Sequence, residues 1–185
     1  MNAALRSARY LTTLRMRVSV SIVVCALAVP TLSLEAQQAD LQGVYSIDAD
    51  ASDNIDAAIT RGTEDMNFAI RSLARTRTAK TNPRYARVEI WRNDTTIRVQ
   101  YDARPPIEIP GDGRSVPWVR EDGSTYNVSA RWAATQLVMH FESATGNRIN
   151  TLVLQPDGTT LKFSVELTSS YLPAPITYML TYRRQ

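Results

Sequence analysis

The sequence has one cysteine, Cys25, and one histidine, His140. Cys25 lies in an apolar N-terminal run, so the rest of the chain can form neither a disulfide nor a thiolate metal site. Val24, rather than the small residue that lipidation requires, precedes it. No His-x-x-x-His pair, Gly-x-Ser-x-Gly elbow, phosphate loop or dinucleotide fingerprint is present. We therefore expect no metal ion, no cofactor and no catalytic residues.

Long hydrophobic runs are scarce as well. The run from Val18 to Val29 is shorter than the roughly 20 residues that a helix needs to span a bilayer. It ends at Pro30, and an acid-free segment with four arginines precedes it: Arg6, Arg9, Arg15 and Arg17. This order is typical of a removable secretory signal. We predict a signal peptide over residues 1–36, and a mature protein without a transmembrane span in the periplasm or the extracellular space.

Two details of this signal stay open. The start is either Met1 or Met16, because the segment from Met16 onward is a complete signal by itself. Cleavage fits after Ala36, and a second small-residue site lies at residues 26–28.

An excess of positive charge is absent once the signal is set aside. The whole chain has 21 basic and 18 acidic residues, and four of the basic residues and one acid, Glu35, precede Gln37. The remainder has 21 − 4 = 17 basic and 18 − 1 = 17 acidic residues. We therefore expect no nucleic-acid partner.

One segment has helical spacing. Residues 53 to 76 carry an apolar stripe at intervals of three and four, which forms one face of a helix. Its members are Ile55, Ile59, Met66, Ile70 and Leu73. Ser52 or Asp53 is positioned to cap the helix, and Gly62-Thr63 to kink it.

The rest of the chain alternates with a period of two. Residues 40–47 form a first strand, and short alternating segments follow from Tyr85 onward. Turn pairs such as Asp122-Gly123 separate them. The proline-rich segment 104–113 is an edge strand or a loop. We predict one mainly β domain over residues 37–185. It is an antiparallel up-and-down meander of about eight or nine strands that closes into a barrel, with one helix after the first strand.

The alternation also assigns faces to the last two strands. We expect four residues to be buried: Phe163, Val165, Leu180 and Tyr182. Four others are expected on the exposed face: Lys162, Glu166, Thr177 and Thr181.

The chain resembles lipocalin-like (calycin-type) exported bacterial proteins. The likeness rests on the opening run 40–45, the meander of Asp-Gly hairpins and the basic C-terminal end. That group opens with Gly-x-Trp, and a basic residue near the end of the last strand packs over the Trp. Here Gly43 matches and Tyr45 replaces the Trp, so the resemblance implies that Arg183 or Arg184 covers Tyr45. A long helix, where a lipocalin has a hairpin, departs from the pattern.

The chain also resembles a group of uncharacterised exported bacterial proteins. That likeness covers most of the chain and rests on three runs, at residues 66–68, 155–158 and 182–184.

The helix exit carries the densest positive cluster. Arg71 and Arg75 are four residues apart, so they share a helical face on which two guanidinium groups can converge on one anion; Arg77 lies just beyond. If the helix covers the barrel opening, strand aromatics such as Tyr101 and Trp132 would complete a ligand site. The alternative is that these arginines pair with nearby acids or with the negative end of the helix.

Fold analogy favours an extracytoplasmic binding module for a small apolar, amphipathic or anionic ligand, or a cell-envelope component. The second hypothesis is a structural or interaction protein of the envelope, with a filled core and no ligand. The third is a hydrolase, for which we find no motif.

Overall fold

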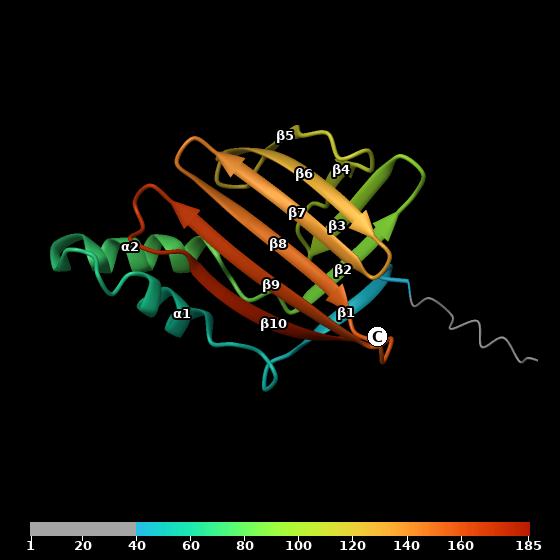
Figure 1. The fold of residues 1–185 in the computed structure, drawn as a ribbon, viewed down its shortest axis with the longest axis horizontal. Helices are drawn as coiled ribbons and strands as arrows, with labels where there is room; N and C mark the ends of the chain where they lie inside the picture. Colours follow the sequence, from blue (N-terminus) through green and yellow to red (C-terminus); the bar gives the residue numbers. More distant parts are fainter. Residues whose placement is uncertain (1–39) are drawn as a thin grey trace, which may run out of the picture. The chain divides into compact units, whose positions relative to one another are not determined.

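The structure, a computed structural model, describes residues 40–185, so the predicted signal peptide lies outside the described residues. Ten antiparallel strands form one sheet in the order β4-β3-β2-β1-β10-β9-β8-β7-β6-β5 (Figure 1). Strands that are neighbours in sequence pair with one another, except β4 and β5, and the first strand also pairs with the last. The predicted meander and barrel are confirmed, with ten strands instead of eight or nine.

The strands are β1 (Gly43–Asp48), β2 (Arg87–Arg92), β3 (Thr96–Tyr101), β4 (Ile107–Pro110), β5 (Val116–Val119), β6 (Thr125–Ala133), β7 (Gln136–Ser143), β8 (Gly146–Leu154), β9 (Thr160–Ser169) and β10 (Ile176–Arg184). The two edges of the sheet, β4 and β5, lie close together, so the barrel is nearly closed. Segment 104–113 therefore contains an edge strand, one of the two alternatives that its prolines left open. Pro110 and Pro117 lack an N–H donor, which suits strands at an unpaired seam.

The segment after β1 forms two helices instead of the predicted one, α1 (Ile55–Gly62) and α2 (Phe68–Thr81). α1 ends after Gly62, where a kink was expected, and the Thr63 side chain donates to the Ile59 carbonyl at 2.7 Å. Asn67 then starts α2 by accepting from the Ala69 amide at 2.9 Å. The N-cap of α1 is Asn54, not Ser52 or Asp53.

The two helices differ in burial. Ile55 and Ile59 of α1 are buried, and Gly62 lies so close to Ile176 of β10 that a Cβ at this position would collide with it. In α2 no residue is buried, and the exposed fractions of Ile70 and Leu73 are 54% and 51%. The predicted stripe is therefore not one continuous face, because its second half lies on a separate helix. Neither helix of residues 40–185 has the length and apolar character that a membrane span requires.

The segment between β1 and α1 covers part of the edge of β10. The Met179 amide donates to Asp53 at 2.7 Å, and the Thr181 amide donates to Ser52 Oγ at 2.9 Å. Phe163, Leu180 and the other two residues expected in the core are buried. The expectation that Thr181 is exposed was wrong: this segment covers its side chain completely.

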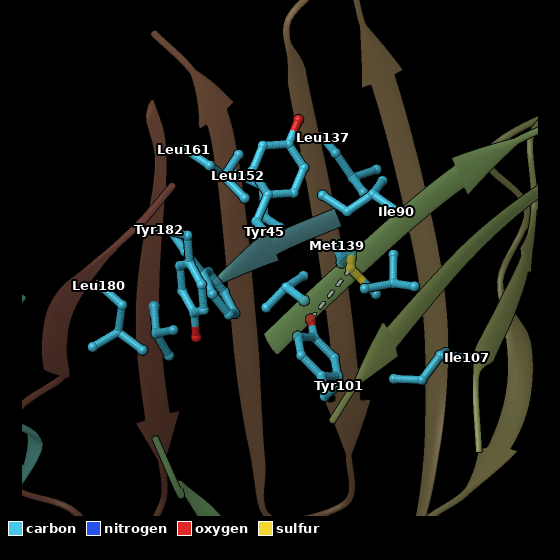
Figure 2. Close-up of a cluster of buried hydrophobic side chains, with 14 of the residues drawn as sticks. Tyr45, Ile90, Tyr101, Ile107, Leu137, Met139, Leu152, Leu161, Leu180 and Tyr182 are labelled. Atoms are coloured by element: carbon cyan, nitrogen blue, oxygen red, sulfur yellow. Dashed lines mark hydrogen bonds between the residues drawn. The ribbon is translucent and has the colours of Figure 1, made fainter. Parts of the chain in front are cut away.

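The barrel interior is filled over much of its length. Figure 2 shows the side chains of β1, β7, β8, β9 and β10 meeting between the strands. Those without solvent exposure include Tyr45, Leu137, Met139, Leu152, Leu161 and Tyr182. The end of the barrel near α2 is hollow, and this end forms the candidate site.

Candidate ligand-binding site

A cavity of about 450 Å³ opens at the barrel end where α2 finishes. Its walls come from the last turn of α2, both sides of the β4–β5 seam, the β7–β8 turn and the end of β9. This end lies at the left of Figure 1, beside the helices. The volume is within the roughly 300–1,000 Å³ that is common for small-molecule sites.

Arg148 of β8 supplies a fixed positive charge to this cavity. Its Nε donates to Asn150 Oδ1 at 2.7 Å, and one terminal nitrogen donates to Asn82 Oδ1 at 2.5 Å. Both asparagines are buried, with exposed fractions of 2% and 5%. Among residues 40–185, no carboxylate lies within ion-pair distance of Arg148. Two neutral amides therefore hold the guanidinium without neutralising its charge.

Two other arginines line the cavity and are already engaged. Arg104 forms an ion pair with Glu121 at 3.1 Å. Arg120 donates to the Thr81 carbonyl at 3.0 Å and lies 3.8 Å from Asp122. Arg148 thus differs from both in lacking a carboxylate partner.

Tyrosine hydroxyls extend the polar network around Arg148. Asn150 donates to the Tyr101 hydroxyl at 3.4 Å, and the Tyr178 hydroxyl donates to Asn82 Oδ1 at the same distance. Burial raises the pKa of Tyr101 and of Tyr178, and the nearby charge of Arg148 opposes this only in part. Both phenols are therefore neutral at physiological pH, and the net charge of the network is that of Arg148.

Aromatic rings form much of the cavity wall. Tyr85 stacks on Tyr101 with 4.6 Å between the ring centroids. Across the seam, Trp118 lies edge-on to Phe141 at 5.8 Å and tilted towards Tyr126 at 5.9 Å. The walls therefore offer apolar aromatic surfaces beside Arg148, the lining arginine without a carboxylate partner among residues 40–185.

The structure separates the five residues that the sequence suggested as a ligand site. Tyr101 lines the cavity, whereas the other four are not among its lining residues. Arg71 donates to the Met66 carbonyl at 2.7 Å, and Arg75 Nε donates to Thr63 Oγ1 at 3.0 Å. Both guanidinium groups thus bind the link between the helices.

The remaining two suggested residues also lie elsewhere. Arg77 is exposed on α2. Trp132 is near the other end of β6, where Arg92 lies over its ring at 4.9 Å.

Sequence reasoning missed Arg148, Asn150 and Asn82. On β8 the inward positions run Arg148, Asn150, Leu152, Leu154, so the half nearest the cavity is polar on its inner face. A signal was present: outward Ile149 and inward Arg148 reverse the usual alternation near the start of β8, close to the Ala144-Thr145 turn. A reversed alternation at the end of a barrel strand predicts a polar group in the lumen.

Metal ligands do not gather anywhere in the part of the chain that the structure describes: no three His, Cys, Asp or Glu side chains come together there. His140 lies on the exposed face of β7, as the alternation predicted.

No family model matches the chain, and no curated protein is similar to it in sequence. Solved structures do resemble it. The REP1-NXSQ fatty acid transporter superposes with a TM-score of 0.50 at 12% identity, over 78% of this chain and 96% of that one. Fatty-acid-binding protein 1 of Echinococcus granulosus gives 0.49 at 12% identity, over 77% and 96%. Human cRBP IV gives 0.48 at 18% identity, over 80% and 99%. At these identities the likeness to the first of them shows the fold alone: the chain is a calycin-type β-barrel.

Proposed function

We propose that the protein is an extracytoplasmic binding module that holds a small amphipathic anion in the cavity near α2. The observation that carries this proposal is Arg148, a guanidinium fixed by Asn82 and Asn150 in a cavity with aromatic walls and without a carboxylate partner. The apolar part of the ligand would contact the rings, and its anionic group would pair with Arg148.

The physical reason lies in the cost of a partly buried charge. An arginine removed from water is stabilised best by an anion that accepts two parallel hydrogen bonds. In Arg148 the Nε and one terminal nitrogen donate to the amide oxygens of Asn150 and Asn82, and none of these partners carries a charge. A carboxylate or phosphate would accept hydrogen bonds from the guanidinium and supply the missing negative charge.

Two further observations are consistent with this role. The REP1-NXSQ protein, which shares the fold, is by its name a fatty acid transporter. The N-terminal order of arginines, apolar run and small residues suits export, for which we propose cleavage between Val29 and Ala39. Intact mass of protein secreted by its own host tests the export part separately, and a product that retains Met16 contradicts it.

The binding test uses 1-anilinonaphthalene-8-sulfonate, a fluorescent aromatic anion. The wild-type protein should bind it saturably. Arg148→Met should lower the affinity for the probe at least tenfold, and Arg148→Lys, which keeps the positive charge, should lower it less. Arg131→Gln, which alters an exposed arginine of β6, is the matched control and should change nothing. Because α2 exposes apolar side chains that attract the probe, the series is repeated in a Leu73→Ser background.

The rival hypothesis is an envelope protein that binds no ligand. The filled interior around Tyr45, Leu137 and Met139 favours it over part of the barrel, and the cavity favours the binding module at the other end. Probe binding that is absent, or equally strong in wild type and Arg148→Met with both variants folded by circular dichroism, would support this rival.

A further inference from the structure

We propose that the site selects a compact, ring-bearing anion, of the aryl carboxylate class, over a long-chain fatty acid. This inference rests on the proposed function and goes further by naming the ligand class. Three features carry it: a closed floor, a filled barrel below the floor, and flat aromatic walls above it.

Tyr101 and Asn150 form the floor of the cavity. Their exposed fractions are 6% and 2%, and both are lining residues. Tyr101 is fixed from below, because its hydroxyl donates to the Met139 sulfur at 3.9 Å and its ring stacks on Phe163 at 6.1 Å. Figure 2 shows this hydroxyl directed at Met139. The floor is therefore part of the core and not a loose flap.

Below the floor the barrel has no space for an alkyl chain. Met139 and Phe163, which contact Tyr101, have exposed fractions of 0% and 1%, and neither lines the cavity. Protein interiors are close-packed, so a chain that entered this region would have to displace core side chains. A ligand is consequently confined to the space between the floor and the mouth.

Above the floor the walls suit a ring. Tyr85, which stacks on the floor residue Tyr101, lies on one side of the β4–β5 seam, and Trp118 and Phe141 lie on the other, so aromatic rings line both sides of the cavity. Offset-stacked and edge-to-face contacts add roughly 0.5–1.5 kcal/mol per aromatic pair beyond burial, and an alkyl chain gains none of this. Arg148 is hydrogen-bonded to the floor residue Asn150, so its guanidinium lies close to the floor. A ligand with only a short link between its ring and its carboxylate can therefore contact the aromatic walls and Arg148 at the same time.

The test is displacement of 1-anilinonaphthalene-8-sulfonate from the wild-type protein by 1-naphthoate, octanoate and hexadecanoate, each below its aggregation limit. We expect 1-naphthoate to displace the probe at a concentration at least tenfold lower than hexadecanoate, with octanoate no weaker than hexadecanoate. Equal or better displacement by hexadecanoate, or displacement by none of the three, overturns the inference. Probe binding that does not depend on Arg148 is a different result, because it contradicts the proposed function itself.

A second variant tests the floor directly. Met139→Ala removes the support of Tyr101 and opens space beneath it. We expect hexadecanoate to gain at least fivefold in displacement relative to 1-naphthoate. An unchanged ratio in a variant that is folded by circular dichroism shows that the floor does not set the ligand length. If the variant does not fold, the wild-type displacement series still decides the matter.

Discussion

Arg184 lies over Tyr45 at the barrel end opposite the cavity. Its guanidinium carbon is 5.2 Å from the ring centroid, and one of its nitrogens donates to the Tyr45 hydroxyl at 2.8 Å. That hydroxyl in turn donates to the Leu41 carbonyl at 2.7 Å. The resemblance to lipocalin-like proteins implied this pair, with tyrosine in place of tryptophan, and it left open whether Arg183 or Arg184 was the partner. The structure selects Arg184.

We expect Arg184→Ala to destabilise the protein by about 1–3 kcal/mol, because it removes the cation–π contact and leaves the buried Tyr45 hydroxyl without a donor. Arg183→Gln is the control: the Arg183 side chain is 55% exposed and pairs with Asp48, so its loss should cost less than about 1 kcal/mol. Urea denaturation measures both. Equal destabilisation by Arg184→Ala and Arg183→Gln would show that the Tyr45–Arg184 pair contributes no more to stability than an exposed ion pair.

Thr181→Val tests the segment that covers β10. The Thr181 hydroxyl donates to the Ala51 carbonyl at 2.6 Å and accepts from Lys162 at 2.9 Å, and the residue is fully buried. Valine keeps the shape but leaves both partners unpaired, so we expect a loss of about 1–3 kcal/mol. Thr177→Val, on the exposed face of the same strand, should stay within about 0.5 kcal/mol. A neutral Thr181→Val would mean that this segment detaches readily.

The double variant Arg71→Gln/Arg75→Gln separates the two hypotheses for the helix arginines. Arg71 and Arg75 donate to the Met66 carbonyl and the Thr63 hydroxyl, so we expect the double variant to lose about 1–2 kcal/mol of unfolding free energy. Each kcal/mol lowers Tm by roughly 2–4 °C. Probe binding should be unchanged. Arg77→Gln, on the exposed side of α2, serves as control for the melt. An unchanged Tm with lost probe binding would support the ligand role suggested by the sequence.

Asp157, in the β8–β9 turn, makes the stability of the protein depend on pH. Hydrogen bonds from the Thr160 side chain and from the Thr160 and Thr159 amides lower the pKa of its carboxyl from the ordinary 3.8 to about 2. A lowered pKa contributes stability that is complete above pH 3.8 and is lost as pH falls towards 2. We expect the urea midpoint of the wild type to fall more steeply between pH 4 and pH 2 than that of Asp157→Asn. Parallel curves would contradict this role.

The fold was largely predictable because its outer and inner faces differ in polarity. Alternation placed Phe163 and Leu180 inside, and turn pairs such as Asp122-Gly123 placed hairpins. The break between α1 and α2 was harder to predict, since the close contact of Gly62 with Ile176 of β10 depends on tertiary packing.

The site was less predictable than the fold. A cluster of charges in sequence drew attention to Arg71 and Arg75, whereas the arginine that stands out in the cavity, Arg148, is isolated in sequence and, among residues 40–185, has no carboxylate within ion-pair distance. Its partner Asn82 lies 66 positions away in the chain, and only the folded barrel brings the two together.

The position of β1 between β2 and β10 has a consequence for how the barrel forms. Tyr45 pairs with Arg184, so β1 cannot complete its ladder until β10, 139 positions further along the chain, is available. Contacts between such distant residues carry a large loop-closure entropy and make folding slow. A nascent chain stopped before β10 leaves one edge of β1 unpaired and the core around Tyr182 absent, so the order of synthesis itself delays closure of the barrel.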